Sequence, residues 1–293
     1  MNKILTITLI SVFVTFTGMS QAIADTLGEL IYSSWGRLCS TTAQGGTERC
    51  IEGGKEIDSP AWQPGGDLIV AEQGVHDGVH DLVLLSSKGK FETRLENSSS
   101  FIRPVWSPDG SYIYAISYSL GTQIGRWGKN GKSFRTIPIL GADGMFKYAQ
   151  MLAFSPSGTR LSILVDKFQT MLLADVHTDV IKVQRQVPLN FTYVSGSAWL
   201  DESRLLFIGT QEGNRQELWE MKASDGSVTK KGIPNLWLRD FLTLSPDRRT
   251  VVVCGVSDNG KETKWNLWKY SLETAALVRL TSGTEDVEPN WRR

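Results

Sequence analysis

The chain has 293 residues, with 31 Lys or Arg against 31 Asp or Glu, 41% hydrophobic residues and 21% charged residues. These proportions are typical of a globular protein and exclude a disordered or collagen-like chain. The balanced charge also excludes a strongly basic nucleic-acid binder, because neutralising phosphates requires clustered Lys and Arg.

The first 24 residues have the features of a secretory signal peptide. Lys3 precedes an uncharged, mostly apolar run over 4–19, and Ala22 and Ala24 form a small-residue A-x-A cleavage site. An uncleaved membrane anchor is the alternative, but it requires about 20 apolar residues and suitable flanking charges. We therefore expect cleavage after Ala24 and a single exported domain over 25–293 with no transmembrane segment.

Three cysteines follow the expected cleavage site. Cys39 and Cys50 flank a turn-forming stretch over 43–46, Ala-Gln-Gly-Gly. A hairpin there would place the two residues opposite each other, so the sequence predicts a Cys39–Cys50 disulfide in an oxidising compartment. Cys254 lies in the apolar run Thr-Val-Val-Val-Cys-Gly-Val and is predicted to be a buried free thiol.

One pattern recurs along the chain: a large apolar anchor, a turn resembling Ser-Pro-Asp-Gly, and a β-branched run. Its clearest copy is Trp106-Ser107-Pro108-Asp109-Gly110, followed by Ser111-Tyr112-Ile113-Tyr114. Pro fixes the first corner of the turn and Gly supplies the positive φ that reverses the strand. The anchors recur at intervals of 44 to 48 residues, at Trp62, Trp106, Phe154, Trp199, Leu244 and Trp291.

An interval of this length matches one four-stranded blade of a β-propeller. Each repeat contains further short β-rich runs separated by tight turns, as hairpins require. Residues 28–57 lack a first strand, and 287–293 provide a first strand without successors. The sequence therefore predicts an all-β, six-bladed β-propeller whose ring closes through N-terminal strands and a C-terminal strand in one blade. The Trp anchors are expected to pack between blades as core.

The repeat is similar to that of TolB-type propellers, and the similarity covers roughly 28–293 as six copies. The resemblance implies a periplasmic, non-enzymatic scaffold for protein–protein interaction, with an envelope protein or lipoprotein as partner. It does not extend to the separate N-terminal α/β domain of TolB, since only Asp25-Thr26-Leu27 precede the first expected strand. A TolB-like stand-alone propeller is the resulting expectation.

Two groups of residues attract attention as sites. His76 and His80, with Asp77 and Asp81, fall in one inter-strand loop, where a metal site is the weaker alternative to a solvated loop. The second group leads into the innermost strands and surrounds one mouth of the channel, where it would suit polar recognition or a divalent cation such as calcium. It comprises Asp58, Arg103, Tyr148, Gln150, Tyr193, Arg239, Asp240, Asp286 and Glu288.

Three functional classes follow from these patterns. A binding scaffold of the cell envelope is the expectation, because the sequence lacks H-E-x-x-H, C-x-x-C and G-x-S-x-G motifs. A propeller enzyme acting on polysaccharide or peptide, a lyase or a hydrolase, is the first alternative. A periplasmic protein that binds a small ligand or a sugar is the second, and it would show the same aromatic pocket in every blade.

Overall fold

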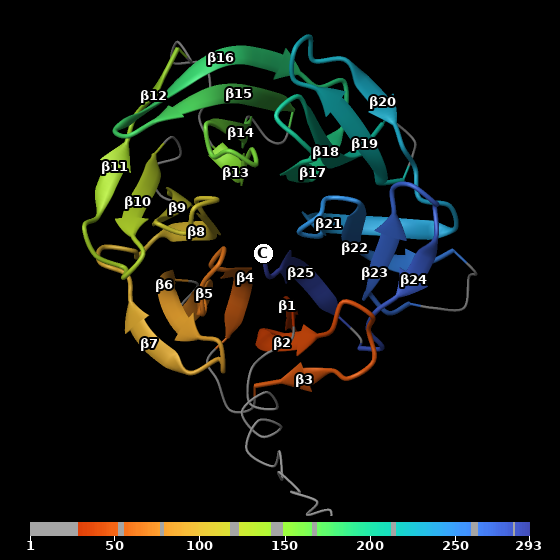
Figure 1. The fold of residues 1–293 in the computed structure, drawn as a ribbon, viewed down its shortest axis with the longest axis horizontal. Coiled ribbons are helices and arrows are strands. Elements are labelled where there is room, and N and C mark those ends of the chain that lie inside the picture. Colours follow the sequence, from red (N-terminus) through yellow and green to blue (C-terminus); the bar gives the residue numbers. More distant parts are fainter. Residues whose placement is uncertain are drawn as a thin grey trace, which may run out of the picture.

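The structure is a computed structural model, and it describes residues 29–51, 56–76, 79–117, 123–141, 149–165, 169–211, 215–258, 263–283 and 285–293. The expected signal peptide over 1–24 lies outside these ranges. The described chain forms six sheets, antiparallel except for one short strand, arranged as the blades of a ring around a central axis (Figure 1). The predicted six-bladed β-propeller is confirmed. Within the described ranges, no helix has the length and apolar character needed to cross a membrane.

Blade 1 is built from both ends of the chain, as the sequence predicts. Its innermost strand comes from the C-terminal end and pairs with the first N-terminal strand, with Leu30 opposite Trp291 and Ser34 opposite Asp286. This pairing completes blade 1 and closes the ring. From the channel outwards, blade 1 contains β25 (Asp286–Trp291), β1 (Leu30–Ser34), β2 (Arg37–Thr41) and β3 (Arg49–Cys50).

The innermost strands of blades 2 to 6 are β4, β8, β13, β17 and β21. In each of these blades the next three strands follow outwards in chain order. Blade 2 contains β4 (Ile57–Trp62), β5 (Leu68–His76), β6 (Val79–Ser86) and β7 (Phe91–Arg94), and blade 3 contains β8 (Phe101–Trp106), β9 (Tyr112–Ser117), β10 (Ile124–Gly128) and β11 (Arg135–Ile137).

Blade 4 gains a fifth strand that the sequence does not predict, because β12 runs parallel to β16 on its outer edge. Blade 4 contains β13 (Ala149–Phe154), β14 (Arg160–Val165), β15 (Thr170–His177), β16 (Val180–Pro188) and β12 (Ile139–Leu140). Blade 5 contains β17 (Tyr193–Trp199), β18 (Arg204–Thr210), β19 (Glu217–Lys222) and β20 (Val228–Lys230). Blade 6 contains β21 (Leu236–Leu244), β22 (Thr250–Ser257), β23 (Asn266–Ser271) and β24 (Leu277–Arg279).

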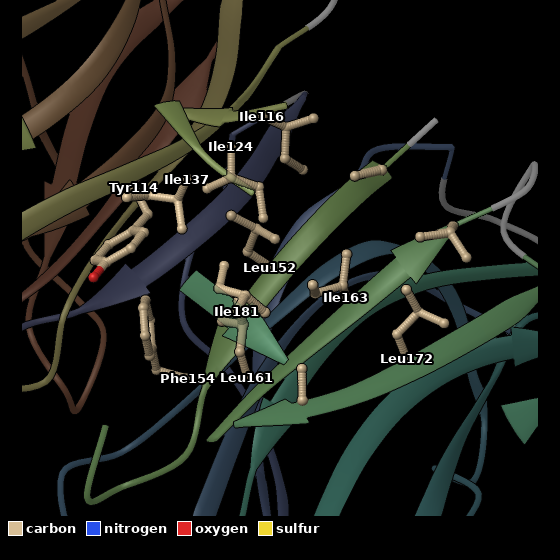
Figure 2. Close-up of a cluster of buried hydrophobic side chains, with 13 residues drawn as sticks. Tyr114, Ile116, Ile124, Ile137, Leu152, Phe154, Leu161, Ile163, Leu172 and Ile181 are labelled. Carbon is tan, nitrogen blue, oxygen red and sulfur yellow. The ribbon is translucent and has the colours of Figure 1, made fainter. Parts of the chain in front are cut away.

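The core lies between neighbouring blades, because each sheet is apolar on both faces. Figure 2 shows one such layer, in which Tyr114 and Ile116 of blade 3 meet Phe154 and Leu161 of blade 4. The Trp anchors belong to these layers, as predicted, and two of them also clasp the preceding blade. Trp106 and Trp199 donate their Nε1–H to the carbonyls of Ala61 and Ala153, at 3.1 and 3.0 Å.

The Ser-Pro-Asp-Gly turns have the geometry that their chemistry predicts. In blade 3, Ser107 Oγ donates to Asp109 Oδ1, the N–H of Gly110 donates to the carbonyl of Ser107 at 2.9 Å, and Gly110 has φ of 68°. In blade 6, Arg248 occupies the position of this glycine and keeps a left-handed φ of 60°. A non-glycine residue rarely adopts that conformation, so Arg248 is a strained departure from the repeat.

The predicted disulfide is present. Cys39 lies opposite Cys50 in the β2–β3 pair, and the two are bonded. Cys254 is a free, buried cysteine, as predicted.

Candidate functional site

A ring of bulges lies midway along the innermost strands. In every blade the pairing register of the innermost strand shifts two to five residues before the anchor. Bulges of this kind re-aim side chains and often occur next to functional sites. The residues that line the channel at this level are Ser59, Arg103, Met151, Gly196, Phe241 and Glu288, of which all but Met151 have a left-handed φ.

We name the two ends of the channel from this ring. The front mouth is the end where the innermost strands begin, and several of the residues that the sequence singled out lie there. The rear mouth is the end where those strands finish, at the anchors and the Ser-Pro-Asp-Gly turns.

Arg103 crosses the channel. It projects from β8 in blade 3, donates from a guanidinium N–H to the carbonyl of Gln150 in blade 4 at 2.8 Å, and places its guanidinium carbon 5.5 Å from the ring centre of Phe241 in blade 6. Strands β8 and β21 lie on opposite sides of the ring centre (Figure 1). The Arg103–Phe241 cation–π contact therefore spans the channel between blades 3 and 6.

Two carboxylates bind the backbone of the bulges. Glu288 of blade 1 accepts a hydrogen bond from the N–H of Ser59 in blade 2, and Glu72 of blade 2 accepts one from the N–H of Arg103 in blade 3, at 2.7 Å. Burial raises the pKa of Glu288 to about 7, and the nearby charges of Glu72 and Asp58 add to the rise. Burial likewise raises the pKa of Glu72. Both carboxylates thus act as structural ties between blades.

The front mouth brings together several of the predicted residues. Arg239 forms an ion pair with Glu285 and lies over the ring of Trp265, with 5.4 Å from its guanidinium carbon to the ring centre. Burial raises the pKa of Tyr193 to about 12, and the charge of Asp240 adds to the rise. Tyr193 belongs to blade 5, Arg239 and Asp240 belong to blade 6, and Glu285 directly precedes β25 of blade 1.

Other predicted residues are placed differently. Asp58 accepts a hydrogen bond from Ser33 Oγ at 2.9 Å, which joins blades 1 and 2. Asp286 is 1% exposed, so it lies inside blade 1 and does not face solvent at the mouth. Gln150 contributes its backbone carbonyl to Arg103. Tyr148 lies outside the described residues.

The sequence left a metal site at His76 and His80, and a divalent cation at the front mouth, as alternatives. Among the described residues, no group of three or more His, Cys, Asp or Glu side chains is arranged to hold a metal ion. The side chain of His76 lies outside the described part of the chain, and His80 sits in β6 opposite Gly74, with its Nδ1 buried and without a hydrogen-bond partner in that part.

Behind Arg103 lies a cavity of about 180 Å³ that runs to the rear mouth. Its walls are mainly the indole rings and prolines of the repeats, including Trp62 and Trp106. Its ionisable lining residues are Arg103, Glu288 and Arg293. In Figure 1 the C-terminal end of the chain lies at the centre of the ring, which agrees with the position of Arg293.

This cavity and the ring of bulges were not predicted from the sequence. A signal was present, because Pro60, Pro104 and Pro289 interrupt three of the inner strands two residues before the anchor. Proline inside a central strand marks a bulge, since it cannot donate to the sheet. The crossing of the channel by Arg103 had no local signal, because it depends on a residue in the opposite blade.

Comparison with known proteins supports the architecture. No family model and no curated protein matches the chain. Among solved structures, TolB from Acinetobacter baumannii superposes with a TM-score of 0.67 at 16% identity, covering 93% of this chain and 69% of that one. The fold is that of a TolB-like propeller.

Two further structures mark the range of this likeness. A protein assigned as TolB from Agrobacterium tumefaciens has a TM-score of 0.62 at 14% identity, over 80% of this propeller and 84% of that chain. Oligogalacturonate lyase from Vibrio parahaemolyticus has a TM-score of 0.53 at 13% identity, over 86% and 73%. Identities this low show a shared fold, and binding proteins and enzymes both use it.

Proposed function

We propose that the protein is an exported, periplasmic scaffold that holds an envelope protein at the front mouth of its TolB-like propeller. Two exposed indoles at this mouth carry the proposal. Trp35, which follows β1 in blade 1, is 68% exposed, and Trp237, near the start of β21 in blade 6, is 52% exposed. Exposed Trp with Arg and Tyr is the composition of protein-binding hot spots.

Trp237 is held in place without being covered. Its Nε1–H donates to Asp258 Oδ1 at 2.6 Å, and the other oxygen of Asp258 pairs with Arg215 at 2.7 Å. A side chain fixed before binding loses less conformational entropy when a partner arrives. The Arg239–Glu285 pair nearby supplies a polar margin to the apolar surface.

The export part of the proposal rests on the sequence. The N-terminal segment has signal-peptide features, and the Cys39–Cys50 disulfide is of the kind that persists in oxidising compartments. The likeness to TolB structures supports the same location.

Site-specific photo-crosslinking in intact cells tests the scaffold. A photoreactive amino acid at position 237 should yield a discrete adduct with one envelope protein. The same label at Phe91, which is 51% exposed on the outer strand β7 of blade 2, is the matched control and should yield none. Adducts of equal yield from both positions, or none from position 237, would reject the proposal.

The purified partner then allows a quantitative test. Trp237→Ala should weaken its affinity by about thirtyfold, the equivalent of about 2 kcal/mol for a hot-spot indole. Arg239→Glu should weaken it through charge reversal at the same mouth, whereas Phe91→Ala should leave it unchanged. Unchanged affinity in both front-mouth variants would place the partner elsewhere.

A polysaccharide lyase is the second candidate function, favoured by the structural likeness to oligogalacturonate lyase. Incubation of the mature protein with oligogalacturonate, with and without added divalent metal, tests it through the ultraviolet absorbance of the unsaturated product. Turnover abolished by mutation at a channel residue would establish the enzyme.

A further inference from the structure

We propose that the cavity behind Arg103 is a second binding site, which takes an acidic side chain from a loop of a protein partner through the rear mouth. This site lies at the opposite end of the channel from the front mouth and does not depend on the function proposed there. The ligand class follows from three arginines without close ion pairs and from the shape of the cavity.

An arginine lies at each end of the cavity. Arg103 forms its base, and Arg293 lines its rear end, where burial and the neighbouring charge of Arg248 lower the pKa of Arg293 to about 10. Arg293 belongs to the exposed residues, so part of it is accessible from the rear mouth. Arg248 donates to the carbonyl of Trp199, a residue that lines the cavity.

These cations form no close ion pair in the described part of the protein, although Asp201 and Glu202 act electrostatically on Arg248, and Glu72 and Glu288 on Arg103. Among the described residues, no carboxylate lies within ion-pair distance of the guanidinium groups of Arg103, Arg248 or Arg293. The one acid in the lining, Glu288, is already engaged by Ser59 and has a pKa near neutrality. Guanidinium groups that lack a close ion pair keep donors available for an anion.

Two of the arginines replace residues that the repeat uses at the same places. Arg248 stands where the motif has Gly110, and Arg293 stands where it has Pro108. The replacements fall in adjacent blades, 6 and 1, and the charge of Arg248 lowers the pKa of Arg293. Arg248 also retains the left-handed φ that suits glycine. Strain kept at a position where glycine would relieve it indicates a role for the side chain.

The walls favour an acidic peptide over a sugar acid. The anchors that line the cavity are each less than a tenth exposed, so none offers an open ring face on which a sugar could stack. About 180 Å³ accommodates a single inserted side chain. Trp62 adds a donor, because its Nε1–H is buried and has no hydrogen-bond partner among the described residues. A carboxylate could accept from this indole and from arginine.

Binding of fluorescently labelled tetraglutamate to the mature protein tests the site. Saturable binding that weakens as salt rises is expected. Arg248→Gly restores the motif glycine, so it should raise the midpoint of thermal unfolding. It should also weaken the affinity for tetraglutamate by about tenfold, as expected for one lost ionic hydrogen bond. Arg293→Gln should weaken binding by a similar factor.

Arg249→Gln is the matched control. Arg249 neighbours Arg248 in the same turn but is exposed and pairs with Glu273 at 3.5 Å, so its removal changes the net charge equally and should leave binding unchanged. Equal weakening by Arg249→Gln, or no saturable binding, would overturn the proposal. So would digalacturonate binding in place of tetraglutamate, or displacement by equimolar sulfate, which would reveal a sugar-acid site or an unselective anion site.

The two proposals fail separately. Arg248→Gly should leave the photo-crosslink from position 237 intact, because the two sites lie on opposite sides of the Arg103–Phe241 contact. Loss of that crosslink in Arg248→Gly would mean that the two mouths bind one ligand, and it would contradict a separate rear site.

Discussion

The carboxylate of Glu288 accepts a hydrogen bond from the backbone N–H of Ser59, 229 residues earlier in the chain. Ser59 Oγ lies 3.3 Å from the other carboxylate oxygen. This contact joins blade 1 to blade 2 at the ring of bulges. It lies next to the seam where the two ends of the chain share a sheet. The ionisable side chain of Glu288 therefore helps to hold the two ends of the ring together.

Because burial raises the pKa of Glu288 from 4.5 to about 7, folding favours its protonated form. Its contribution to stability is fully present below pH 4.5 and is lost as pH rises through about 7. Glu288→Gln keeps an oxygen acceptor for Ser59 without the charge. The free energy of unfolding of this variant, relative to wild type, should therefore rise by about 1–3 kcal/mol between pH 4.5 and pH 8.

Urea denaturation at a series of pH values measures this difference. Asp201→Asn is the control, since hydrogen bonds from Ser203 and Arg204 outweigh burial and lower the pKa of Asp201 to about 2. Asp201 stays ionised throughout the window, so the difference between this variant and wild type should be constant. A flat difference for Glu288→Gln as well would show that the Glu288 carboxylate carries its charge without cost.

The indole clasps between blades give a second prediction. Trp106 and Trp62 are equivalent anchors, and both are buried, yet only Trp106 donates its Nε1–H to the preceding blade. Trp106→Phe leaves the buried carbonyl of Ala61 without this donor, whereas Trp62→Phe removes an N–H that lacks a partner. Trp106→Phe should therefore lower the free energy of unfolding by about 1–2 kcal/mol more than Trp62→Phe. Equal losses in chemical denaturation would mean that the clasp contributes nothing beyond packing.

The sequence predicted the parts of this fold that local chemistry determines. The turn at Ser107–Gly110 depends on residues within the turn, and the anchors repeat at the length of one blade, so both can be recognised without coordinates. Ring closure followed from counting strands at the two ends, and the pairing of Leu30 with Trp291 bears it out.

Contacts between distant repeats could not be predicted in the same way. Asp286 was expected at the mouth, but its place at the seam of blade 1 buries it, and the start of a strand gives no sign of how deep that strand lies. The Arg103–Phe241 contact needs two bulges in opposite blades to aim the side chains at each other. Arg248 and Arg293 were visible as departures from the motif, but their proximity emerges only when the ring closes.

The Cys39–Cys50 disulfide is expected to stabilise the seam from the outer side of blade 1. Replacing both cysteines by Ser should lower the free energy of unfolding by about 3 kcal/mol, the loop-entropy value for a closed loop of this length. Thiol titration of the denatured wild type should find one reactive group, from Cys254, and the Cys254→Ser variant should show none. In the native protein Cys254 should react slowly, because it is fully buried and burial raises the pKa of its thiol. Three thiols in denatured protein kept under non-reducing conditions would contradict the bridge.

Gly196 occupies the ring of bulges in blade 5, with φ of 50°. A Cβ at this position would lie 3.0 Å from the Cα of Phe241 and 3.1 Å from the backbone N of Leu242, both in blade 6. Gly196→Ala should therefore impose both a conformational cost and a backbone clash, lowering the free energy of unfolding by about 2–4 kcal/mol.

Gly232→Ala separates these two costs. Gly232 also has a left-handed φ, of 59°, but the nearest atom to its Cβ would be the flexible end of Lys230 at 3.8 Å. Gly232→Ala should lower the free energy of unfolding only by the conformational cost, about 1–2 kcal/mol. The excess loss in Gly196→Ala, measured by urea denaturation of both variants, then reports how closely blades 5 and 6 approach at the channel. If the two variants lose equal stability, the inner strands of blades 5 and 6 can move apart at the ring of bulges. The position of Phe241 against Arg103 would then not be rigidly fixed.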